Sequence, residues 1–451
     1  MFRLTGWRKA DDWGSTEAIP AFLGETPDGG PVSEMWFGDH PDGPTGISGD
    51  GGGTLAELIA ADPRAALGKG LLFSFGPHLP YLAKLIAPAE ALSLQVHPTK
   101  EIAREGYLRE DVLGIPRNDP RRTYRDMNHK PEMIYALTDF EALVGFRVPR
   151  KARSVLGDLP GDLAASLRDR LNMPTLRGGL RSLVTWLFDR DSPATPEAVE
   201  EFAAGCRARL EAGTSPSVRA DSLVARLAEV HPGDPGIIVA FLMNPVSLRA
   251  GEAVYIPPRQ IHSYQSGFGI EVMAASDNVI RAGLTEKFVD ADQLVEIVEY
   301  SALPPVRVGA EHPGEHTDRF LAQAQEFMLS VTTVDSGSGA GSGAGAGSGA
   351  GSGSGEGSGA GSSGGEGSGA VEVPGEGPRI VICTEGKVVL ETPEGAQANG
   401  SGGGAAPTVH SARPLGVGVA GFGGVALRGE ARLPLERGRG VFVSASEGTL
   451  F

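Results

Sequence analysis

Three separate segments of this chain carry side chains of the types that bind metal ions. Two imidazoles, a carboxylate and an amide oxygen come from His97, His262, Glu132 and Gln95. This set suits a borderline divalent cation, most simply zinc, without any thiolate ligand. Gln95 and His97 are two residues apart on a predicted strand, so their side chains point to the same face. The sequence therefore predicts one zinc ion per chain at these four residues.

Each of these residues also has an ordinary structural interpretation when it is considered alone. Gln95 and His97 would then lie on a solvated strand face. Lys130 and Glu132 would form a surface ion pair, and His262 would be a turn histidine. A functional site is favoured because basic residues stand in the same segments, and such residues suit an anionic substrate such as a sugar phosphate. These basic residues are Lys130, Arg281 and Lys287.

The order and spacing of several short segments narrow these alternatives. They include Gln-x-His at 95–97 and Asn-His-Lys-Pro-Glu at 128–132, and the others are residues 12–14, 34–40, 79–84, 140–147 and 276–287. In this order the segments closely resemble the type I mannose-6-phosphate isomerases, also called phosphomannose isomerases. The resemblance covers most of the chain. Glu286 departs from the family pattern, because proline is frequent at that position, and this change is expected to alter the local turn slightly.

The resemblance implies a zinc-dependent isomerase with Gln95, His97, Glu132 and His262 as its metal ligands. The implied reaction interconverts mannose 6-phosphate and fructose 6-phosphate by moving a proton between C1 and C2 through an enediol intermediate. Such a reaction requires a base, an electrophile that stabilises developing oxyanion charge, and an anchor for the phosphate.

Residues beside the motif segments are candidates for these roles. Arg281 does not readily lose its proton, so we expect it to stabilise charge or position the reacting carbons. Glu271 and Asp277 are the candidate bases, although either could instead orient Arg281, and Lys130 is a further catalytic candidate. The candidates for contacting the substrate, including its phosphate, are Ser93, Lys100, Lys130, Tyr264 and Lys287.

Two other classes of function are compatible with part of this pattern. Two histidines and a carboxylate also occur in iron oxygenases built on the cupin fold. Gln95 and the basic residues argue against that class. A non-catalytic sugar-phosphate sensor with a decayed site is the second alternative, and the complete ligand set and Arg281 argue against it.

Composition and charge limit the possible partners. The net charge of −16 argues against binding to nucleic acids or anionic membranes, so an anionic substrate would need a local positive site. The two cysteines, Cys206 and Cys383, cannot form a disulfide framework, which favours a reducing cytoplasm. The N-terminus lacks the apolar segment of a secretory signal, and no apolar run is long enough to span a bilayer. We expect a cytoplasmic monomer that acts on a small sugar phosphate.

The hydrophobic patterns predict a mainly β fold with an α-helical insertion. Expected strands include 71–75, 91–96, 133–137, 237–242 and 254–257, and expected helices follow the apolar spacing at 163–171, 198–210 and 220–230. The family resemblance implies a cupin-type barrel and a second, cupin-like C-terminal domain. The predicted divisions are a catalytic cupin domain at 1–150 and 231–300, a helical insertion at 151–230 and a C-terminal domain at 301–451.

The C-terminal part contains a long stretch of very low sequence complexity. Residues 335–370 are almost entirely Gly, Ser and Ala, a composition that predicts a flexible linker without a catalytic contribution. Beyond it, 379–383 and 387–390 are predicted to form a hairpin around 384–386, and 437–443 ends a second β unit. This part lacks the ligand set, which indicates a structural role.

Overall fold

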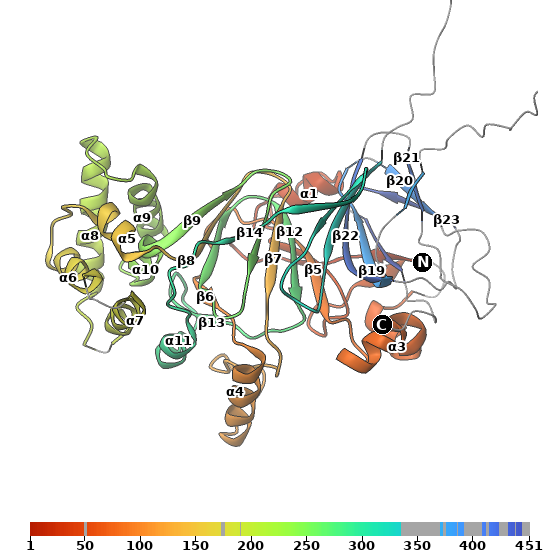
Figure 1. Cartoon of the computed structure of the whole chain (residues 1–451), viewed down its shortest axis with the longest axis horizontal. Helices are drawn as coiled ribbons and strands as arrows, with labels where there is room; N and C mark the ends of the chain where they lie inside the picture. Colours follow the sequence, from red (N-terminus) through yellow and green to blue (C-terminus); the bar gives the residue numbers. More distant parts are fainter. Residues whose placement is uncertain are drawn as a thin grey trace, which may run out of the picture.

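The described strands of the chain form four antiparallel sheets (Figure 1). In this computed structural model the described residues are 1–48, 52–172, 176–189, 191–334, 370–372, 376–385, 387–391, 408–411, 415–423, 432–437 and 439–443. The helices of residues 149–242 gather at one end of the molecule and the eight-stranded sheet lies at the other, with the seven- and five-stranded sheets between them (Figure 1). The expected mainly β architecture with a helical segment is confirmed.

Two facing sheets make up the middle of the molecule. In spatial order, the seven-stranded sheet contains β14 (Val306–Val308), β10 (Ala253–Ile256), β7 (Glu132–Ala136), β12 (Gly269–Ala274), β5 (Tyr81–Ile86), β3 (Glu34–Phe37) and β2 (Trp7–Lys9). The five-stranded sheet contains β13 (Ile280–Arg281), β6 (Gln95–Val96), β11 (His262–Ser266), β8 (Phe140–Phe146) and β9 (Met243–Leu248).

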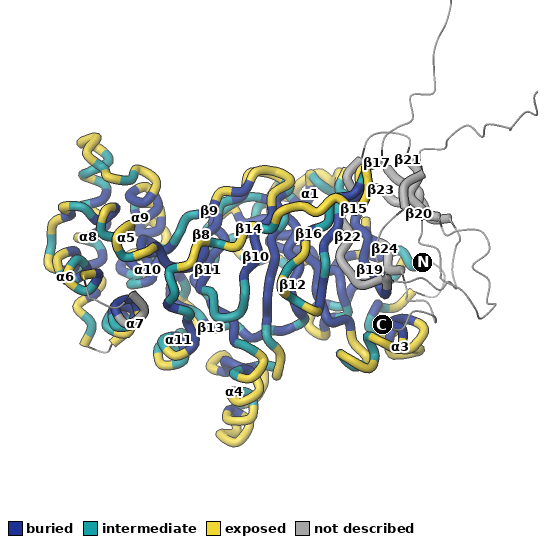
Figure 2. Tube along the Cα trace, in the orientation of Figure 1, coloured by how far each residue is buried: buried dark blue, intermediate teal, exposed yellow. Residues whose placement is uncertain are grey.

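Alternation along the strands sorts side chains between the inside and the outside of this pair of sheets. On β12, Ile270 and Val272 pack towards the eight-stranded sheet, whereas Glu271 points to the opposite face. The space between the two central sheets is filled by apolar side chains from both of them. These are Ile86, Ile134, Ala136, Val254 and Ile256 from one sheet and Phe140, Ala142, Val144, Val246, Leu248 and Tyr264 from the other. The inner strands β7, β10 and β12 are almost entirely buried, whereas β14 at the edge of its sheet is largely exposed (Figure 2).

A run of helices interrupts the five-stranded sheet between two neighbouring strands. The chain leaves the sheet at the end of β8 and returns at β9, where Phe146 is the register partner of Met243. The helices between them are α5 (Pro149–Leu156), α6 (Asp162–Leu171), α7 (Leu176–Leu187), α8 (Pro196–Glu211), α9 (Val218–Val230) and α10 (Gly236–Leu242). Their apolar faces share one core with the outer face of the five-stranded sheet.

The predicted helices of this segment are confirmed, and their ends follow local capping signals. Thr195 accepts a hydrogen bond from the backbone N–H of Ala198 and begins α8, with Pro196 as its first residue. Ser217 caps α9 in the same way. The remaining helices are α1 (Ala18–Leu23), α2 (Leu55–Ala61), α3 (Pro63–Phe75), α4 (Lys100–Val112) and α11 (Ala291–Ile297).

Two predicted strands are wrong because short apolar runs do not distinguish a strand from a buried helix. Residues 71–75 are the end of α3, which is capped at its start by Asp62. Residues 237–242 belong to α10, all of which is buried. Asp234 accepts the N–H of Gly236 and thereby favours the helical start.

The predicted strand-and-turn region 71–146 also contains α4, which the sequence interpretation missed. Thr99 caps this helix, and its outer part projects from the molecule as an exposed segment (Figure 2). The expected strand 91–96 is reduced to the two residues of β6. The strands predicted at 133–137 and 254–257 correspond to β7 and β10.

The eight-stranded sheet combines strands from both ends of the chain. In spatial order it contains β15 (Ala310–Gly314), β16 (Thr317–Phe320), β17 (Leu329–Val334), β22 (Leu415–Gly423), β19 (Glu376–Cys383), β24 (Gly440–Val443), β1 (Phe2–Thr5) and β4 (Gly46–Ser48). The predicted division treats the N-terminal residues as catalytic domain alone, whereas β1 and β4 lie beside C-terminal strands. Conversely, β14 falls within the predicted C-terminal domain, but it pairs with β10 of the seven-stranded sheet.

The predicted hairpin of 379–383 and 387–390 is wrong because its two strands belong to different sheets. β19 pairs with β22 and β24. The next strand, β20, belongs to a four-stranded sheet whose members, in spatial order, are β18 (Ala370–Glu372), β21 (Thr408–Ser411), β20 (Lys387–Glu391) and β23 (Arg432–Glu436). The low-complexity stretch lies outside the described residues, apart from Ala370. No helix within the described residues is long and apolar enough to cross a membrane.

Candidate metal centre and active site

Three of the four predicted ligands meet at the ends of strands from the two central sheets. Glu132 is the first residue of β7, His262 is the first residue of β11, and His97 directly follows β6. All three side chains are buried, with at most 1% of each exposed. One potential ligand atom of each residue lies within 4.8 Å of those of the others. Because the two central sheets face each other, they bring together residues that are far apart in the chain.

The carboxylate of Glu132 lies between the two imidazoles. Its Oε1 atom is 3.2 Å from Nε2 of His97, and its Oε2 atom is 3.0 Å from Nε2 of His262. Lys130 Nζ is 2.9 Å from Oε1 of the same carboxylate. The two imidazole rings have a centroid separation of 5.0 Å. Both Nε2 atoms therefore point at one small, acidic position.

Backbone carbonyls determine which nitrogen of each imidazole is available. Nδ1 of His97 lies 2.7 Å from the carbonyl oxygen of Asn278, and Nδ1 of His262 lies 3.0 Å from that of Gln260. A carbonyl only accepts, so each Nδ1 carries the proton and each Nε2 presents a lone pair. Neither buried Nε2 atom has a hydrogen-bond partner. This is the arrangement that histidine ligands require, so the residues fit a divalent metal.

The charge states of the ligands agree with this interpretation. Burial, followed by the positive charge of Lys130, lowers the pKa of His97 to about 4. Burial alone would raise the pKa of Glu132, but Lys130 and His97 outweigh burial and hold that pKa well below its usual range. A neutral imidazole and an ionised carboxylate are the forms that bind metal.

Gln95, the fourth predicted ligand, lies beside the same site. It is the register partner of His262 on one side and of Arg281 on the other. Side chains of directly opposed residues project from the same face of a sheet, so Gln95, His262 and Arg281 share one face. Gln95 is only partly buried, in contrast to the other three predicted ligands.

A second buried ionic group adjoins the metal position, and sequence reasoning missed its central residue. Lys84 Nζ is 2.8 Å from Glu271 Oε2 and 3.8 Å from Glu34 Oε2, and the side chains of this lysine and Glu271 are 8% and 4% exposed. Lys84 also lies 5.2 Å from the ring centroid of Trp36. Burial lowers the pKa of Lys84, but Glu271 and Glu34 more than reverse that effect and keep it charged. The sequence signal that could have revealed Lys84 is the presence of a lysine within the otherwise apolar strand β5.

Tyr264 connects these two groups. Its hydroxyl donates to Oε2 of Glu132 over 3.4 Å, and its ring packs edge-on against Phe140 in the apolar interior. Burial, together with the charges of Glu132 and Glu271, raises its pKa well above the usual value. The phenol therefore remains protonated and acts as a hydrogen-bond donor to the ligand carboxylate.

A group of positive charges lies beside the metal position. Burial, and then the charge of Arg125, lowers the pKa of Arg281. The pKa of the largely exposed Lys287 is also lowered, first by partial desolvation and then by Arg281. Neither cation forms a hydrogen bond or ion pair through its side chain with another residue of the described segments. Cations that repel one another and form no ion pair within the described segments are suited to binding an anion.

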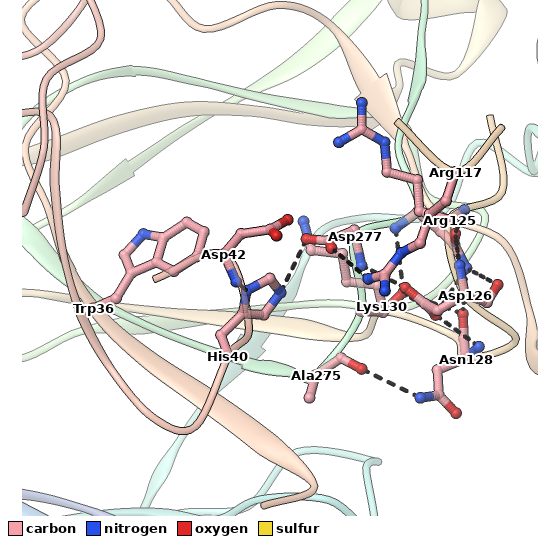
Figure 3. Close-up of polar contacts among 12 residues, drawn as sticks. Trp36, His40, Asp42, Arg117, Arg125, Asp126, Asn128, Lys130, Ala275 and Asp277 are labelled. Carbon is pink, nitrogen blue, oxygen red and sulfur yellow. Dashed lines mark hydrogen bonds and ion pairs between the residues drawn. The ribbon is translucent and has the colours of Figure 1, made fainter. Parts of the chain in front are cut away.

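Asp277, one candidate base, lies at the rim of the site and is already engaged (Figure 3). Its Oδ1 atom is 3.1 Å from His40 Nε2, and its Oδ2 atom is 3.6 Å from Arg117 Nη2. The backbone N–H of Asp42 donates to Nδ1 of His40 over 3.2 Å, so Nε2 of that ring carries its proton and donates to Asp277. Burial raises the pKa of Asp277, but the hydrogen bond from His40 and nearby positive charges lower it overall.

Two predicted substrate contacts lie in less informative positions. Ser93 is partly buried in the segment that leads into β6. Lys100 is exposed as the first residue of α4 and forms no ion pair with the other described residues. His129, which was left out of the predicted ligand set, is turned away from the metal position: its Nε2 lies 2.7 Å from Oε1 of Glu326.

Comparisons with known proteins point to one enzyme family. Residues 1–149 match the family model described as phosphomannose isomerase type I, catalytic domain. The chain is 34% identical over 309 residues to mannose-6-phosphate isomerase of Escherichia coli, an alignment that covers 66% of this chain and 76% of that protein. It is 32% identical over 339 residues to the Salmonella typhimurium enzyme of the same name, covering 73% of this chain and 84% of that protein.

Solved structures give the same result over almost the whole chain. A mannose 6-phosphate isomerase bound with zinc and yttrium is 25% identical, with a TM-score of 0.74 and coverage of 99% of each chain. A zinc-bound holo form is also 25% identical with a TM-score of 0.74, and the match covers 98% of this chain and 99% of that one.

Proposed function

Because this chain belongs to the type I mannose-6-phosphate isomerase family, we propose that the residues described above carry out the family's reaction in the following way. The chain is a zinc-dependent aldose–ketose isomerase that interconverts mannose 6-phosphate and fructose 6-phosphate. The observation that carries this assignment is the convergence of two unpartnered Nε2 atoms on the carboxylate of Glu132.

We propose that His97, Glu132 and His262 hold the zinc ion, with Gln95 as the fourth ligand. When bound, the ion supplies Lewis-acid polarisation and a template for the hydroxyl and carbonyl oxygens of the sugar. Support for Gln95 comes from its position directly opposite His262 in the sheet. Tyr264 orients Glu132 through its hydroxyl and is therefore a positioning residue, although the sequence suggested a substrate contact.

For proton transfer we favour Glu271 over Asp277. Glu271 is buried beside the metal position and forms an ion pair with Lys84. Asp277 is held by His40 and Arg117 at the rim, where its carboxylate already has two partners. Glu271 would take the proton from C2 of open-chain mannose 6-phosphate, the C2–H electron pair would form the C1=C2 bond, and the C1=O pair would move to O1, which takes up a proton to give the enediol. Glu271 would then return its proton to C1, while O2 releases its proton and forms the C2=O bond of fructose 6-phosphate. Lys84 balances the charge of this carboxylate in the interior.

The positive group beside this position is proposed to anchor the substrate. Arg281, Lys287 and Arg125 would receive the phosphate or stabilise the negative charge of the enediolate. Lys130 contributes a further buried positive charge beside Glu132. The net charge of −16 repels an anionic substrate, so a local group of positive charges is needed to bind it. These residues provide such a group. Ser93 and Lys100 remain candidate substrate contacts.

We further propose that the two central sheets form a cupin-type barrel and that the eight-stranded sheet belongs to a cupin-like second domain. The helical segment is an insertion whose extent, 149–242, exceeds the predicted 151–230. We propose a monomer that functions in the cytoplasm without nucleic-acid or membrane partners.

The assigned activity is tested by a coupled assay of mannose 6-phosphate turnover before and after chelation and return of zinc. We expect turnover by the purified protein, loss of turnover on chelation, and recovery when about one zinc per chain is restored. Binding of mannose 6-phosphate without turnover in the zinc-loaded protein would support a sugar-phosphate sensor. Oxygen consumption with bound iron would support an oxygenase.

Glu271→Gln is expected to lower turnover by about two to four orders of magnitude while zinc content stays at the level of the parent protein. Glutamine keeps the shape of the side chain but cannot accept the C2 proton. The test is steady-state kinetics combined with incorporation of deuterium from heavy water into the product, which should fall with turnover. Asp221→Asn is the matched control because Asp221 is a buried carboxylate paired with Arg209 in the helical segment. Parental turnover in Glu271→Gln would exclude Glu271 as the base.

A further inference from the structure

A buried asparagine connects the loop that supports one proposed metal ligand with the loop that leads to another. Asn278 lies between β12 and β13 and is 0% exposed. Its backbone carbonyl accepts the hydrogen bond from Nδ1 of His97 over 2.7 Å. Through this contact Asn278 defines which nitrogen of His97 faces the metal position and limits the rotation of its ring.

The side chain of the same residue binds the backbone of a second segment. Its Oδ1 atom accepts the N–H groups of Arg125 over 2.7 Å and of Asp126 over 3.2 Å. Its Nδ2 atom donates to the carbonyl oxygens of Asp126 over 2.9 Å and of Asn128 over 2.8 Å. The amide thus uses both its acceptor and its donor capacity on residues 125–128.

That second segment leads directly to charged residues of the site. Lys130 follows Asn128 by two residues, and Glu132 begins β7 two residues later. Arg125 itself belongs to the positive group, since its charge lowers the pKa of Arg281. The amide of Asn278 therefore controls the start of the segment that carries Arg125, Lys130 and Glu132.

Neighbouring hydrogen bonds hold the two loops together at the same place (Figure 3). The carboxylate of Asp126 accepts the hydroxyl of Ser276 over 2.9 Å and the N–H of Asp277 over 2.7 Å. Ser276 Oγ in turn accepts the N–H of Asn278 over 3.2 Å. The network contains none of the proposed metal ligands, and it contacts His97 through the backbone carbonyl of Asn278.

We propose that Asn278 is a positioning residue that fixes His97 relative to the segment leading to Lys130 and Glu132, and so sets the geometry of the metal centre. Aspartate cannot replace it, because a carboxylate would face the carbonyls of Asp126 and Asn128 without a proton to donate. Alanine removes the link to residues 125–128 but keeps the backbone bond to His97. This proposal rests on the proposed metal site, and it concerns how the ligands of that site are held in place.

The test measures metal binding directly. Asn278→Ala and Asn278→Asp are prepared free of metal, and their zinc affinity is determined by competition with a chelating indicator. We expect affinity to fall by about 10–100-fold, the range found when groups that orient metal ligands are removed. The absorption spectrum of the cobalt(II)-substituted protein should also change, because it reports the arrangement of ligands around the ion, and turnover of the zinc-loaded variants should fall.

Asn244→Ala is the matched control. The Nδ2 atom of Asn244 also donates to backbone carbonyls, including that of Phe146 at 2.8 Å, but its strand β9 is two strands away from β11. This variant should be destabilised without a change in zinc affinity or in the cobalt spectrum. A general loss of stability would therefore be distinguished from a displaced ligand.

Folded Asn278 variants with the parent's zinc affinity and cobalt spectrum would overturn the proposal. If neither variant folds, Asp126→Asn tests the same connection from the opposite side, because it weakens the acceptor for Ser276, Asp277 and Asn278. Parental zinc affinity and spectrum in Asp126→Asn would then overturn it. If the parent protein itself binds no zinc, the proposed metal site fails rather than the role of Asn278 alone.

Discussion

His97→Ala and His262→Ala will each lose both zinc and isomerase activity. Each substitution removes one of the two Nε2 lone pairs that face Glu132, and with it one of the proposed metal ligands. Zinc content, measured by elemental analysis after dialysis, should fall from about one per chain to near zero. Turnover of mannose 6-phosphate should fall to the background rate, and excess zinc should restore little of it.

Loss of activity through unfolding is separated from loss of the ligand by circular dichroism and thermal unfolding of each variant. His312→Ala is a suitable control, since the side chain of His312 is 70% exposed and pairs with Asp318 far from the proposed ligands in sequence. It should keep both zinc and turnover. Full activity of either ligand variant in a verified metal-free sample would contradict the assignment of the metal centre.

Arg281→Ala should lower turnover by about two orders of magnitude or more while leaving zinc content unchanged. The guanidinium is partly buried and shares a sheet face with Gln95 and His262. It is therefore placed to stabilise charge on the reacting sugar, and removing one such donor typically has an effect of this size. Steady-state kinetics and zinc analysis on the same preparation test both parts of the prediction.

Arg281→Lys distinguishes a general charge effect from geometric recognition. Lysine restores one positive charge but not the planar fork, so we expect poor recovery of turnover. Arg219→Ala serves as the control, because Arg219 is a half-exposed partner of Glu141 and should have no effect on kinetics. A variant in which only the Michaelis constant rises, with turnover unchanged, would show that Arg281 is a uniform binding contact.

The chemistry of the site was predictable from the sequence because the relevant signals are local. The two-residue spacing of Gln95 and His97 predicts that their side chains lie on the same face of a strand. Lys130 and Glu132 occur in the same short motif. The helical segment was also predictable, since the apolar spacing of Leu163, Leu167 and Leu171 buries one face of α6. Short runs without such spacing were ambiguous: 237–242 forms α10, where burial on all sides is compatible with either type of element.

Long-range pairing decided the contacts that no local pattern contains. The ion pair of Lys84 and Glu271 exists because β5 and β12 are neighbours in a register that places these residues opposite each other. A shift by one residue would turn one of them to the other face. The predicted hairpin of 379–383 and 387–390 failed for the same reason, since β19 found its partners in β22 and β24.

The sequence by itself determined the types of ligand, the family resemblance and the helical insertion. Only the tertiary structure decided how each ligand is presented. The carbonyl oxygens of Gln260 and Asn278 select the Nε2 atoms of His262 and His97, and His40 engages Asp277 at the rim. Every residue has a backbone carbonyl, so residue identity does not reveal which carbonyl will face an imidazole. That choice follows from the packing of loops that are distant in the chain, and it makes the three side chains suitable for holding one ion.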